Sequence, residues 1–460
     1  MRKMKALATT ASLAAAAMLL AACGGGTSGA PEGGSPEGNK DLNAAIKAVT
    51  ADELKGTTIT MSRMFGDCEE TTQGVTDTAK ATSECEAIQI LTNKFNAENE
   101  FGIKIERLGG SDWNSYYDAF NASIAGGEPA DVANLHDYAL SDYAKRGQLL
   151  SFNPADFGIE MSDATAQAQK SVQYDGSTYA VPFDSHALLW HVNTDILEQA
   201  GYMKDGKPVS PTSPEEFLQM AKDVKEKTGK YIMSVGVAND DMLWRTFFTF
   251  VAQQGGALLN EDGSANVNSA EAKKALEFIN QLIEGEYIHT NADYAGSIDE
   301  WKNEKSAILA NGTWAVNEYA ATSTFGYTVV DFPTVFNQSA AWASSHMWVM
   351  PTQKDNDPVQ YRAAIEFAKY LYNNTDTWSL ATGHFSPRVS VINSDAYLNA
   401  PLRSNYTETA LKNITFVPQV DNWTAIKSLI HTQLEEVWFN GKAIDAALTE
   451  AQSRVEQQTK

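Results

Sequence analysis

Short runs of β-branched and apolar residues alternate with amphipathic segments along most of this chain. "TTITMSRMF" is typical of a strand that ends near Phe65. "AIQILTNKFNAEN" places Ile88, Leu91 and Phe95 on one face of a helix, and "FGIKIERLGG" alternates as the next strand. Because the two patterns keep alternating up to a helix that Gly147 stops, the sequence indicates an α/β fold, and we expect a mostly parallel sheet.

The second half of the chain repeats this alternation. "SPEEFLQMAKDVKEKTG" begins with Ser213 as the N-cap residue and Pro214 at the first helical position, and we expect Glu216 to close a capping box. Further helices are expected over about residues 269–285, 358–373, 423–439 and 443–457, with predicted strands in "YIMSVGV", "KSAILANGTW", "GYTVVDFP" and "HMWVMP". At 460 residues, the chain exceeds what one hydrophobic core usually supports, so we expect two domains.

The N-terminal segment has the layout of a secretory signal. Three basic residues among the first five precede an apolar run over residues 11–22 that is too short to span a bilayer. Leu-Ala-Ala-Cys at residues 20–23 resembles the bacterial lipoprotein signal, which implies cleavage after residue 22 and a lipid on the sulfur of Cys23. The Gly-, Ser- and Pro-rich residues up to position 40 predict a flexible linker. An uncleaved helix with Cys23 as an ordinary thiol is the alternative.

The mature chain is strongly acidic. Loss of residues 1–22 removes three positive charges and takes the formal net charge from -23 to -26. Nucleic acids and anionic lipid headgroups attract proteins through Lys and Arg patches, so neither is expected as a partner. We expect a neutral, cationic or protein partner, and no later apolar run reaches membrane-spanning length.

Cys68 and Cys85 are the cysteines that remain once Cys23 carries a lipid. They are 17 positions apart, and export to an oxidising environment predicts a disulfide between them. Such a bond would contribute roughly 3 kcal/mol by closing the polar segment "EETTQGVTDTAKATSE". Two free thiols or a two-ligand metal site are the alternatives.

Four stretches of the chain resemble one known family. "YAVPFDSHALLWHVNTDILEQAGY" contains a Tyr-x-x-Pro strand, an apolar strand, an Asn and a helix in that order, and "KSAILANGTWAVNEY" contains an apolar strand that ends in Asn-Gly-x-Trp. "SSHMWVMP" and "FSPRVSV" follow in the expected order. Over about residues 55–457, the chain resembles the extracellular sugar-binding proteins of ATP-binding cassette importers, the family 1 solute-binding proteins that include maltose-binding protein.

The resemblance implies a two-lobed α/β fold, the type II periplasmic-binding-protein arrangement, with the ligand in a cleft between the lobes. Such interfaces are common sites for small molecules. The resemblance places chain crossings near residues 183–185, 343–345 and 387. The N-terminal lobe would comprise residues 41–184 and 345–387, and the C-terminal lobe residues 185–344 and 388–460.

A sugar site needs flat aromatic surface for the C–H face of the ring. Trp314 follows Asn-Gly where the family often stacks a sugar, and Trp423 opens a helix that often supplies another platform. Trp244 and Trp342 fall near the predicted cleft and the second crossing. Core packing is the alternative for each, because indole rings are large and apolar. Core or surface packing is the prediction for Trp113, Trp190, Trp301, Trp348, Trp378 and Trp438.

Carboxylates and Arg are the expected partners of the sugar hydroxyls. Asp184, at the first crossing, is the main candidate, and a hinge role through backbone N–H groups is its alternative. His136 and Asp137 resemble a loop that lines the first lobe, where the maltose-binding pattern has an aromatic platform, which argues against a malto-oligosaccharide. Further candidates, with surface capping or ion pairing as the alternative, are Asp67, Asp112 and Arg388.

With the resemblance, the sequence predicts a monomeric, lipid-anchored receptor on the outer face of the cell membrane. It would capture an oligosaccharide and deliver it to the permease of an ATP-binding cassette importer, without catalytic residues or a cofactor. A lipid-anchored glycoside hydrolase and a peptide or polyamine receptor on the same fold are the alternatives. Apart from His186 and His191, the seven histidines lack close pairing, which argues against metal binding, and those beside crossings, His186, His346 and His384, are expected to be structural.

Overall fold

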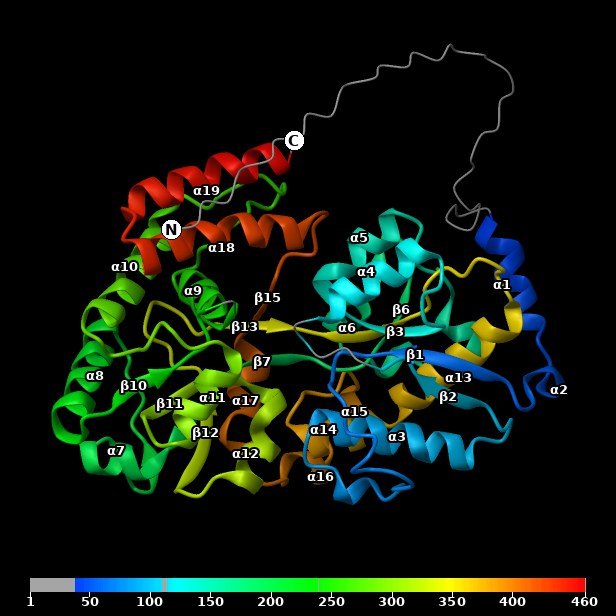
Figure 1. Cartoon of the computed structure of the whole chain (residues 1–460), viewed down its shortest axis with the longest axis horizontal. Helices are drawn as coiled ribbons and strands as arrows, with labels where there is room; N and C mark the ends of the chain where they lie inside the picture. The colour runs from blue at the N-terminus through cyan, green and yellow to red at the C-terminus, as the bar shows by residue number, and fades with distance from the viewer. Residues whose placement is uncertain (1–37, 110–112, 114, 239, 460) are drawn as a thin grey trace, which may run out of the picture. The chain divides into compact units, whose positions relative to one another are not determined.

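The computed structural model describes residues 38–109, 113, 115–238 and 240–459, and these fold around two separate β-sheets, each with its own hydrophobic core (Figure 1). We call the part around the first sheet the N-lobe and the part around the second the C-lobe. The α/β fold is confirmed.

The N-lobe sheet contains, from one edge to the other, β2 (Lys104–Arg107), β1 (Thr58–Ser62), β3 (Val132–His136), β14 (His346–Val349) and β6 (Ala180–Pro182). The C-lobe sheet contains β10 (Tyr231–Ser234), β11 (Ser306–Gly312), β7 (His186–Asn193), β13 (Ala341–Ser344) and β15 (Ile414–Phe416), and β12 (Tyr327–Asp331) also pairs with β7. Two short hairpins pair β4 (Gln173–Tyr174) with β5 (Ser177–Thr178) and β8 (Met203–Lys204) with β9 (Lys207–Pro208).

The helices of the N-lobe are α1 (Gly38–Ala48), α2 (Ala51–Leu54), α3 (Glu84–Glu98), α4 (Tyr116–Gly126), α5 (Leu140–Lys145), α6 (Ala166–Ser171), α13 (Pro358–Asn373) and α14 (Thr375–Thr382). Those of the C-lobe are α7 (Thr194–Ala200), α8 (Pro214–Thr228), α9 (Met242–Gln253), α10 (Ala270–Glu284), α11 (Tyr294–Lys302), α12 (Val316–Thr322), α18 (Trp423–Asn440) and α19 (Ile444–Gln458). Three short helices follow α14: α15 (Val389–Ile392), α16 (Asp395–Leu398) and α17 (Thr407–Asn413).

Helix α8 shows how local sequence sets a helix boundary. It begins at Pro214, and the Ser213 hydroxyl accepts a hydrogen bond from the backbone N–H of Glu216, as predicted. The second half of the predicted capping box is wrong, because the Glu216 carboxylate accepts from the N–H and the hydroxyl of Thr212, one residue before the cap. The helix ends at Thr228, and Gly229 caps it with a φ of 71°, a left-handed conformation that glycine adopts without strain.

Both sheets are mixed, so the prediction of a mostly parallel sheet is wrong. In the N-lobe, β1 is parallel to β2 and β3, whereas β14 is antiparallel to β3 and β6. In the C-lobe, β7 is antiparallel to β11, β12 and β13. A βαβ connection makes neighbouring strands parallel, but β7 and β14 enter their sheets directly from the other lobe and are free of that constraint.

The chain passes between the sheets at three short crossings, which confirms the number that the resemblance implied. Residues 183–185 join β6 to β7, and Ser345 alone joins β13 to β14. The third crossing follows α14 and runs beside the first, since Ser185 and Phe385 exchange two backbone hydrogen bonds of 2.9 Å. The three connections between the lobes therefore lie close together.

The start of the chain adds little to this picture. Cys23 lies outside the described residues. Helix α1 begins at Gly38, inside the segment predicted to be a linker. Among the described residues, no helix combines the length and the apolar character that crossing a membrane requires.

Candidate functional site

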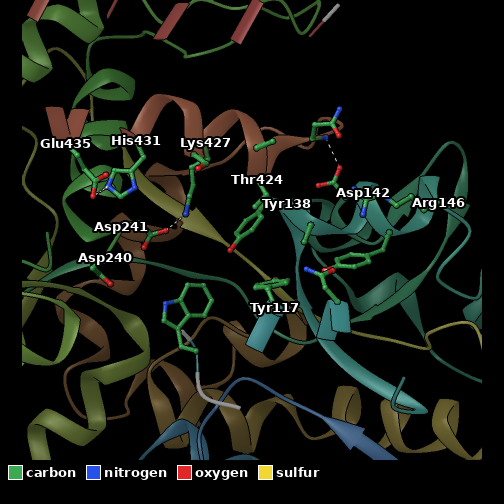
Figure 2. Close-up of a pocket in the computed structure, with 17 residues that line it drawn as sticks. Tyr117, Tyr138, Asp142, Arg146, Asp240, Asp241, Thr424, Lys427, His431 and Glu435 are labelled. Atoms are coloured by element: carbon green, nitrogen blue, oxygen red, sulfur yellow. Dashed lines mark hydrogen bonds and ion pairs between the residues drawn. The ribbon is translucent and has the colours of Figure 1, made fainter. Parts of the chain in front are cut away.

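Two cavities lie between the lobes, and we call the larger one the outer cavity (Figure 2). It has a volume of about 670 Å³. Helices α4 and α5 and residues next to them supply its N-lobe wall, and the residues before α9 together with α18 and the residue before it supply its C-lobe wall. Its lining residues are Trp113, Tyr117, Asn121, Tyr138, Ala139, Asp142, Tyr143, Arg146, Asp240, Asp241, Asn422, Thr424, Ala425, Lys427, Ser428, His431 and Glu435.

Charged groups are paired along the C-lobe wall of the outer cavity. The Asp241 carboxylate accepts a hydrogen bond from Lys427 Nζ at 2.5 Å and lies 2.9 Å from Arg245 Nη2. Burial opposes ionisation of Asp241, but Arg245 and Lys427 hold the pKa of its carboxyl below the usual range. Burial and the charge of Asp241 raise the pKa of Asp240 to about 6. Asp240 therefore carries a proton in mildly acidic solution, whereas Asp241 stays ionised.

The inner cavity is smaller, about 120 Å³, and shares Trp113 with the outer cavity. Its lining residues are Met64, Phe65, Glu84, Trp113, His136, His186, Arg245, Tyr294, Trp314 and His346. The Trp314 indole is fixed in place, because its Nε1 donates a hydrogen bond of 2.8 Å to Tyr294 Oη. The cavity thus combines flat aromatic faces with imidazole, carboxylate and guanidinium groups.

The Arg245 guanidinium lies among three indole rings. Its Cζ is 4.2 Å from the ring centre of Trp342, 5.6 Å from that of Trp113 and 5.8 Å from that of Trp314. Attraction between a cation and an aromatic face stabilises this position. Trp113 belongs to the N-lobe and Arg245 to the C-lobe, so this contact joins the two lobes.

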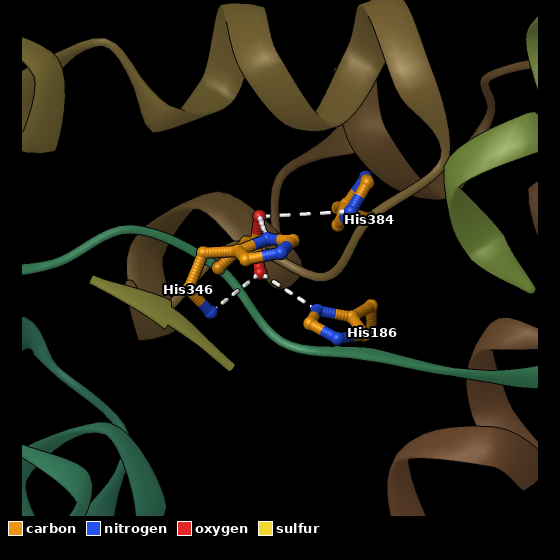
Figure 3. Close-up of side chains that lie close together, drawn as sticks. His186, His346 and His384 are labelled. Atoms are coloured by element: carbon orange, nitrogen blue, oxygen red, sulfur yellow. Dashed lines mark hydrogen bonds and ion pairs between the residues drawn. The ribbon is translucent and has the colours of Figure 1, made fainter. Parts of the chain in front are cut away.

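Asp184 lies behind the inner cavity, and four protein groups surround its buried carboxylate, those of His186 and His346 being shown in Figure 3. Oδ1 accepts a hydrogen bond from the His346 backbone N–H at 3.1 Å and lies 3.2 Å from His186 Nδ1. Oδ2 accepts a hydrogen bond of 2.8 Å from Trp378 Nε1 and lies 2.9 Å from His346 Nδ1. An ionised carboxylate has about four lone-pair positions, so these contacts use all of them.

The charge of this cluster follows from its burial. Burial opposes ionisation of Asp184, yet the His346 and His384 rings and the hydrogen bonds hold the pKa of its carboxyl well below the usual range. Burial lowers the pKa of His186 to about 3 and that of His384 to about 4. Burial opposes protonation of His346 too, but Asp184 raises its pKa. At neutral pH, the cluster therefore contains one carboxylate beside neutral His186 and His384 rings.

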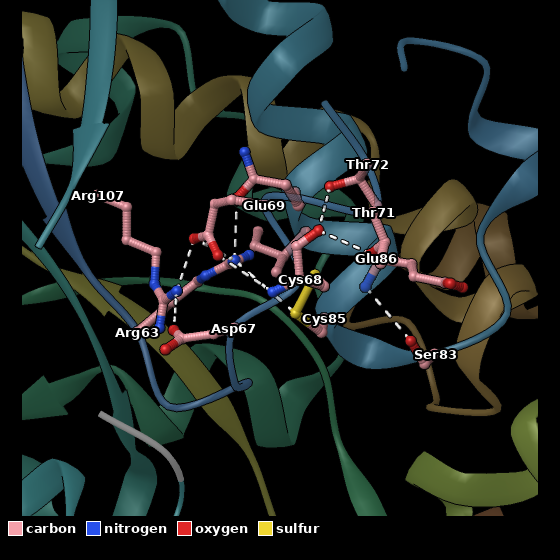
Figure 4. Close-up of a disulfide and its surroundings, with 12 residues drawn as sticks. Arg63, Asp67, Cys68, Glu69, Thr71, Thr72, Ser83, Cys85, Glu86 and Arg107 are labelled. Atoms are coloured by element: carbon pink, nitrogen blue, oxygen red, sulfur yellow. Dashed lines mark hydrogen bonds and ion pairs between the residues drawn. A yellow bond between two sulfur atoms is a disulfide. The ribbon is translucent and has the colours of Figure 1, made fainter. Parts of the chain in front are cut away.

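A disulfide joins Cys68 to Cys85, as predicted (Figure 4). The segment that it closes is also held by an ion pair, since Glu69 Oε1 accepts a hydrogen bond of 2.6 Å from Arg107 Nη1. Glu84, in the wall of the inner cavity, directly precedes Cys85. The disulfide therefore fixes one part of the inner wall.

Comparison with known proteins identifies the family. The sequence profile of the bacterial extracellular solute-binding proteins matches residues 91–405. The chain belongs to this family. The match includes all three crossings of this solute-binding protein and the residues that form the inner cavity from Trp113 onward.

Individual relatives agree with this assignment. The lactose-binding protein of Rhizobium radiobacter is 30% identical over 191 residues, which are 40% of this chain and 42% of the relative, so the match spans less than half of that relative. A maltose-bound MalE3 of T. maritima superposes with a TM-score of 0.73 and 19% identity over 87% of this chain and 100% of that one. The GacH receptor of Streptomyces glaucescens, solved unliganded and with acarbose, superposes with a TM-score of 0.72 and 19% identity over 87% of this chain and 98% of that one. These likenesses confirm the two-lobed fold.

The structure separates the four Trp residues that were expected to stack on a ligand. Trp314 lines the inner cavity of this solute-binding protein. Trp244, Trp342 and Trp423 are instead core residues of the C-lobe and are at most 2% exposed. The ring centres of Trp244 in α9 and Trp423 in α18 are 6.1 Å apart, so the two rings pack between these helices. The Trp342 ring packs against the Arg245 guanidinium. For these three, the packing alternative describes their position.

The predicted polar residues also fall into two groups, those that line a cavity and those that lie behind it. His136 lines the inner cavity, whereas Asp137 and Asp184 lie behind it at the crossings. Asp137 accepts hydrogen bonds from the Ser344 hydroxyl at 2.6 Å and the Ser345 backbone N–H at 3.3 Å. Asp184 therefore joins the first crossing to the second through a backbone N–H, which is the alternative given for it, and Asp137 holds the second crossing.

Of the three other candidates, two form ion pairs with other protein groups and one lies outside the described residues. Asp67 is more than half exposed and pairs with Arg107 beside the disulfide (Figure 4). Arg388 donates a hydrogen bond of 3.0 Å to Asp163. In these two cases, the structure favours the ion-pair alternative over a ligand contact. Asp112 lies outside the described residues.

Several cavity residues were missed or misjudged from the sequence. Trp113, predicted to be a packing residue, lines both cavities. His186 and His346, predicted to be structural, line the inner cavity. Trp244 was predicted to contact the ligand, but its neighbours line the cavities instead, Asp240 and Asp241 the outer one and Arg245 the inner one. Charged residues at the start of an otherwise apolar helix were the signal that could have found them.

The interpretation that the histidines are scattered is wrong. The ring centres of His186 and His346 are 4.3 Å apart, those of His136 and His346 are 4.6 Å apart, and those of His186 and His384 are 5.6 Å apart. These four residues lie far apart in the sequence, and the crossings bring them together.

Proposed function

We propose that this protein is a receptor that captures an oligosaccharide outside the cell and delivers it to the permease of an ATP-binding cassette importer. The observation that carries the proposal is the pair of cavities that share Trp113 between the lobes. The inner one holds a second indole, Trp314, and the outer one adds the rings of Tyr117 and Tyr138. Aromatic surface therefore continues from one cavity to the other.

This arrangement suits the chemistry of a carbohydrate. A sugar ring presents C–H groups on its faces, which pack on indole and phenol rings, and hydroxyls around its rim, which require directed donors and acceptors. Glu84, Asp241 and the imidazole nitrogens supply acceptors, and Arg245 and Lys427 supply donors. Two adjoining cavities favour a ligand of more than one ring over a monosaccharide. The relatives, which include a lactose-binding protein and a receptor solved with acarbose, support this class.

The mechanism follows from the two lobes. A ligand that bonds to both lobes favours the closed arrangement by its differential affinity for that state. In the proposal, the permease recognises the closed form. Capture and delivery of the ligand require neither a catalytic residue nor a cofactor. The receptor acts as a monomer, and the lipid on Cys23 holds it on the outer face of the cell membrane.

A ligand screen tests the proposal. Thermal-shift measurements on the purified protein would cover lactose, maltose, acarbose, arabino-oligosaccharides and fructo-oligosaccharides, with spermidine and a tripeptide as the other ligand classes. We expect one oligosaccharide class to raise the unfolding temperature, to bind with one-to-one stoichiometry in calorimetry and to release no new reducing ends. Release of reducing ends would favour the hydrolase, and a response to spermidine or peptide alone would overturn the sugar assignment.

The anchoring needs a separate measurement. Mass spectrometry of the protein extracted from membranes of its native host would show a mature chain that starts at Cys23 and carries acyl chains. A chain that retains residues 1–22, or an unmodified cysteine, would contradict this part of the proposal.

A further inference from the structure

One carboxylate and three imidazoles meet where the three crossings lie side by side (Figure 3). Asp184 and His186 come from the first crossing and the start of β7, His346 from the second and His384 from the third. One possible ligand atom from each residue lies within 4.8 Å of the other three. All four side chains are at most 6% exposed. Within the described part of the chain, this is the one group of this kind.

The hydrogen bonds of His384 show which nitrogen faces the cluster. The Thr382 hydroxyl donates its hydrogen to the Trp378 carbonyl oxygen at 2.7 Å, so it must accept from His384 Nδ1, 2.9 Å away. In the neutral ring, Nε2 then carries a lone pair. This atom is buried and has no hydrogen-bond partner among the described residues, yet it lies 3.6 Å from Asp184 Oδ2 and 3.3 Å from Glu84 Oε1. A cation between this lone pair and the Asp184 carboxylate would satisfy both groups.

We propose that Asp184, His186, His346 and His384 bind one divalent transition-metal ion, with zinc as the best match. Three imidazole nitrogens and one carboxylate oxygen are ligands that zinc accepts in tetrahedral sites. Ligand atoms at about 2.0–2.1 Å from zinc lie about 3.3 Å from one another in a tetrahedron. His346 Nδ1 and His384 Nε2 lie 2.9 and 3.6 Å from Asp184 Oδ2, and His186 Nδ1 lies 3.2 Å from Oδ1, so the separations lie near this value.

Metal binding requires a change of tautomer in two of the rings. In the structure, Nδ1 of His186 and Nδ1 of His346 lie at hydrogen-bonding distance from Asp184, and a nitrogen that carries hydrogen has no lone pair for a metal. On binding, each hydrogen moves from Nδ1 to Nε2 by exchange with solvent, and the charge of each neutral ring is unchanged. Both rings also line the inner cavity, so metal binding would change the hydrogen-bonding character of its wall.

The surroundings hold the ligand groups in place. Trp378 Nε1 and the His346 backbone N–H donate to the two carboxylate oxygens of Asp184, and Thr382 fixes the His384 ring. Such outer contacts orient metal ligands and raise affinity. The inner cavity supplies the entry path, because His186 and His346 form part of its wall. A bound ion would tie the three crossings together at one point.

Zinc and cobalt binding to the full-length protein tests the proposal. The protein would be treated with EDTA, dialysed and titrated with Zn²⁺ or Co²⁺, and the metal content measured by mass spectrometry. We expect one Zn²⁺ per chain, a higher unfolding temperature and a visible Co²⁺ absorption spectrum of tetrahedral type. Substoichiometric zinc after loading, or an octahedral Co²⁺ spectrum, would overturn the proposal without the need for any variant.

Two variants locate the site. His384→Ala removes one ligand and leaves the four contacts of Asp184 intact, so we expect a folded protein whose zinc affinity falls at least about 10–100-fold. His289→Ala is the control, because His289 is partly exposed and pairs with Glu300 outside the cluster. Equal zinc affinity in His384→Ala and the unmodified protein, or a loss in His289→Ala alone, would place the metal elsewhere.

Discussion

The inner and outer cavities differ in what holds their walls. In the inner cavity, His186 and His346 are fixed by the buried Asp184, and Trp314 by Tyr294. In the outer cavity, Lys427, His431 and Glu435 are partly exposed. A wall of buried, hydrogen-bonded groups is preorganised for one ligand shape, whereas exposed side chains adapt. In the proposed receptor, the inner cavity therefore sets which sugar ring binds, and the outer cavity tolerates different extensions.

The largest expected effect comes from the group that supports the inner wall. Asp184→Ala leaves the donors of His186, His346 and Trp378 without their acceptor in a buried site. We expect a loss of about 3–5 kcal/mol in the free energy of unfolding, measured by chemical denaturation. Asp163→Ala is the control, because its contacts with Arg388 and Ser390 are partly exposed, and we expect a loss well below that of Asp184→Ala. Equal losses would show that Asp184 has no special supporting role.

The next effect depends on pH and involves Asp137. Burial raises the pKa of Asp137 to about 6, above the unfolded value of about 3.9. The neutral carboxyl therefore favours the folded state below about pH 4, and this stabilisation is lost as the pH rises through 6. Relative to Asp137→Asn, the unmodified protein should lose on the order of 2–3 kcal/mol between pH 4 and pH 7. If the difference in the free energy of unfolding between the two proteins stays the same from pH 4 to pH 7, the raised pKa is contradicted.

Ligand affinity should respond more to the inner cavity than to the outer one. Trp314→Ala removes the inner indole face, and we expect about 1–2 kcal/mol weaker binding, roughly 5–30-fold. Glu435→Gln, in the outer wall, should change affinity less than about 3-fold, because exposed charges contribute little. Calorimetry with the tightest oligosaccharide of the screen measures both. A larger effect of Glu435→Gln would reverse the roles that we assign to the two cavities.

The smallest effect is expected at the outer rim. Lys145 Nζ lies 2.5 Å from Asp421 Oδ2 and links α5 to the segment before α18, but both side chains are about a third exposed or more. Asp421→Asn should therefore lower the free energy of unfolding by less than about 1 kcal/mol, and by less still at high salt. Denaturation at low and high salt measures this. A loss of several kcal/mol would show that the outer rim is as rigid as the inner wall.

Local sequence patterns predicted the elements better than the cavities. The caps and periodicity of α8 and α10 depend on residues within a few positions, so the sequence alone predicts them. Family resemblance supplied the two lobes and their crossings. The direction of β7 and β14 could not be predicted, because it depends on pairing between segments that lie far apart in the chain.

The same limit explains the errors at the candidate site. The sequence places Trp423 at a predicted helix start and Trp314 after a predicted strand, but periodicity does not reveal that Trp423 packs against Trp244 of α9 and that Trp314 lines a cavity. The histidine cluster is assembled from positions up to 248 residues apart, since His136 and His384 both lie beside His346. Contacts of that range become visible only in three dimensions.

The three indole rings around Arg245 make the intrinsic fluorescence of the protein sensitive to movement between the lobes. Indole emission depends on nearby charges and on water, and here one ring from the N-lobe and two from the C-lobe surround a single guanidinium. Any movement of one lobe against the other changes the environment of Trp113 at once. Ultraviolet-excited emission of the unlabelled protein should therefore report ligand entry in real time, and Trp113→Phe would identify the ring that produces the signal.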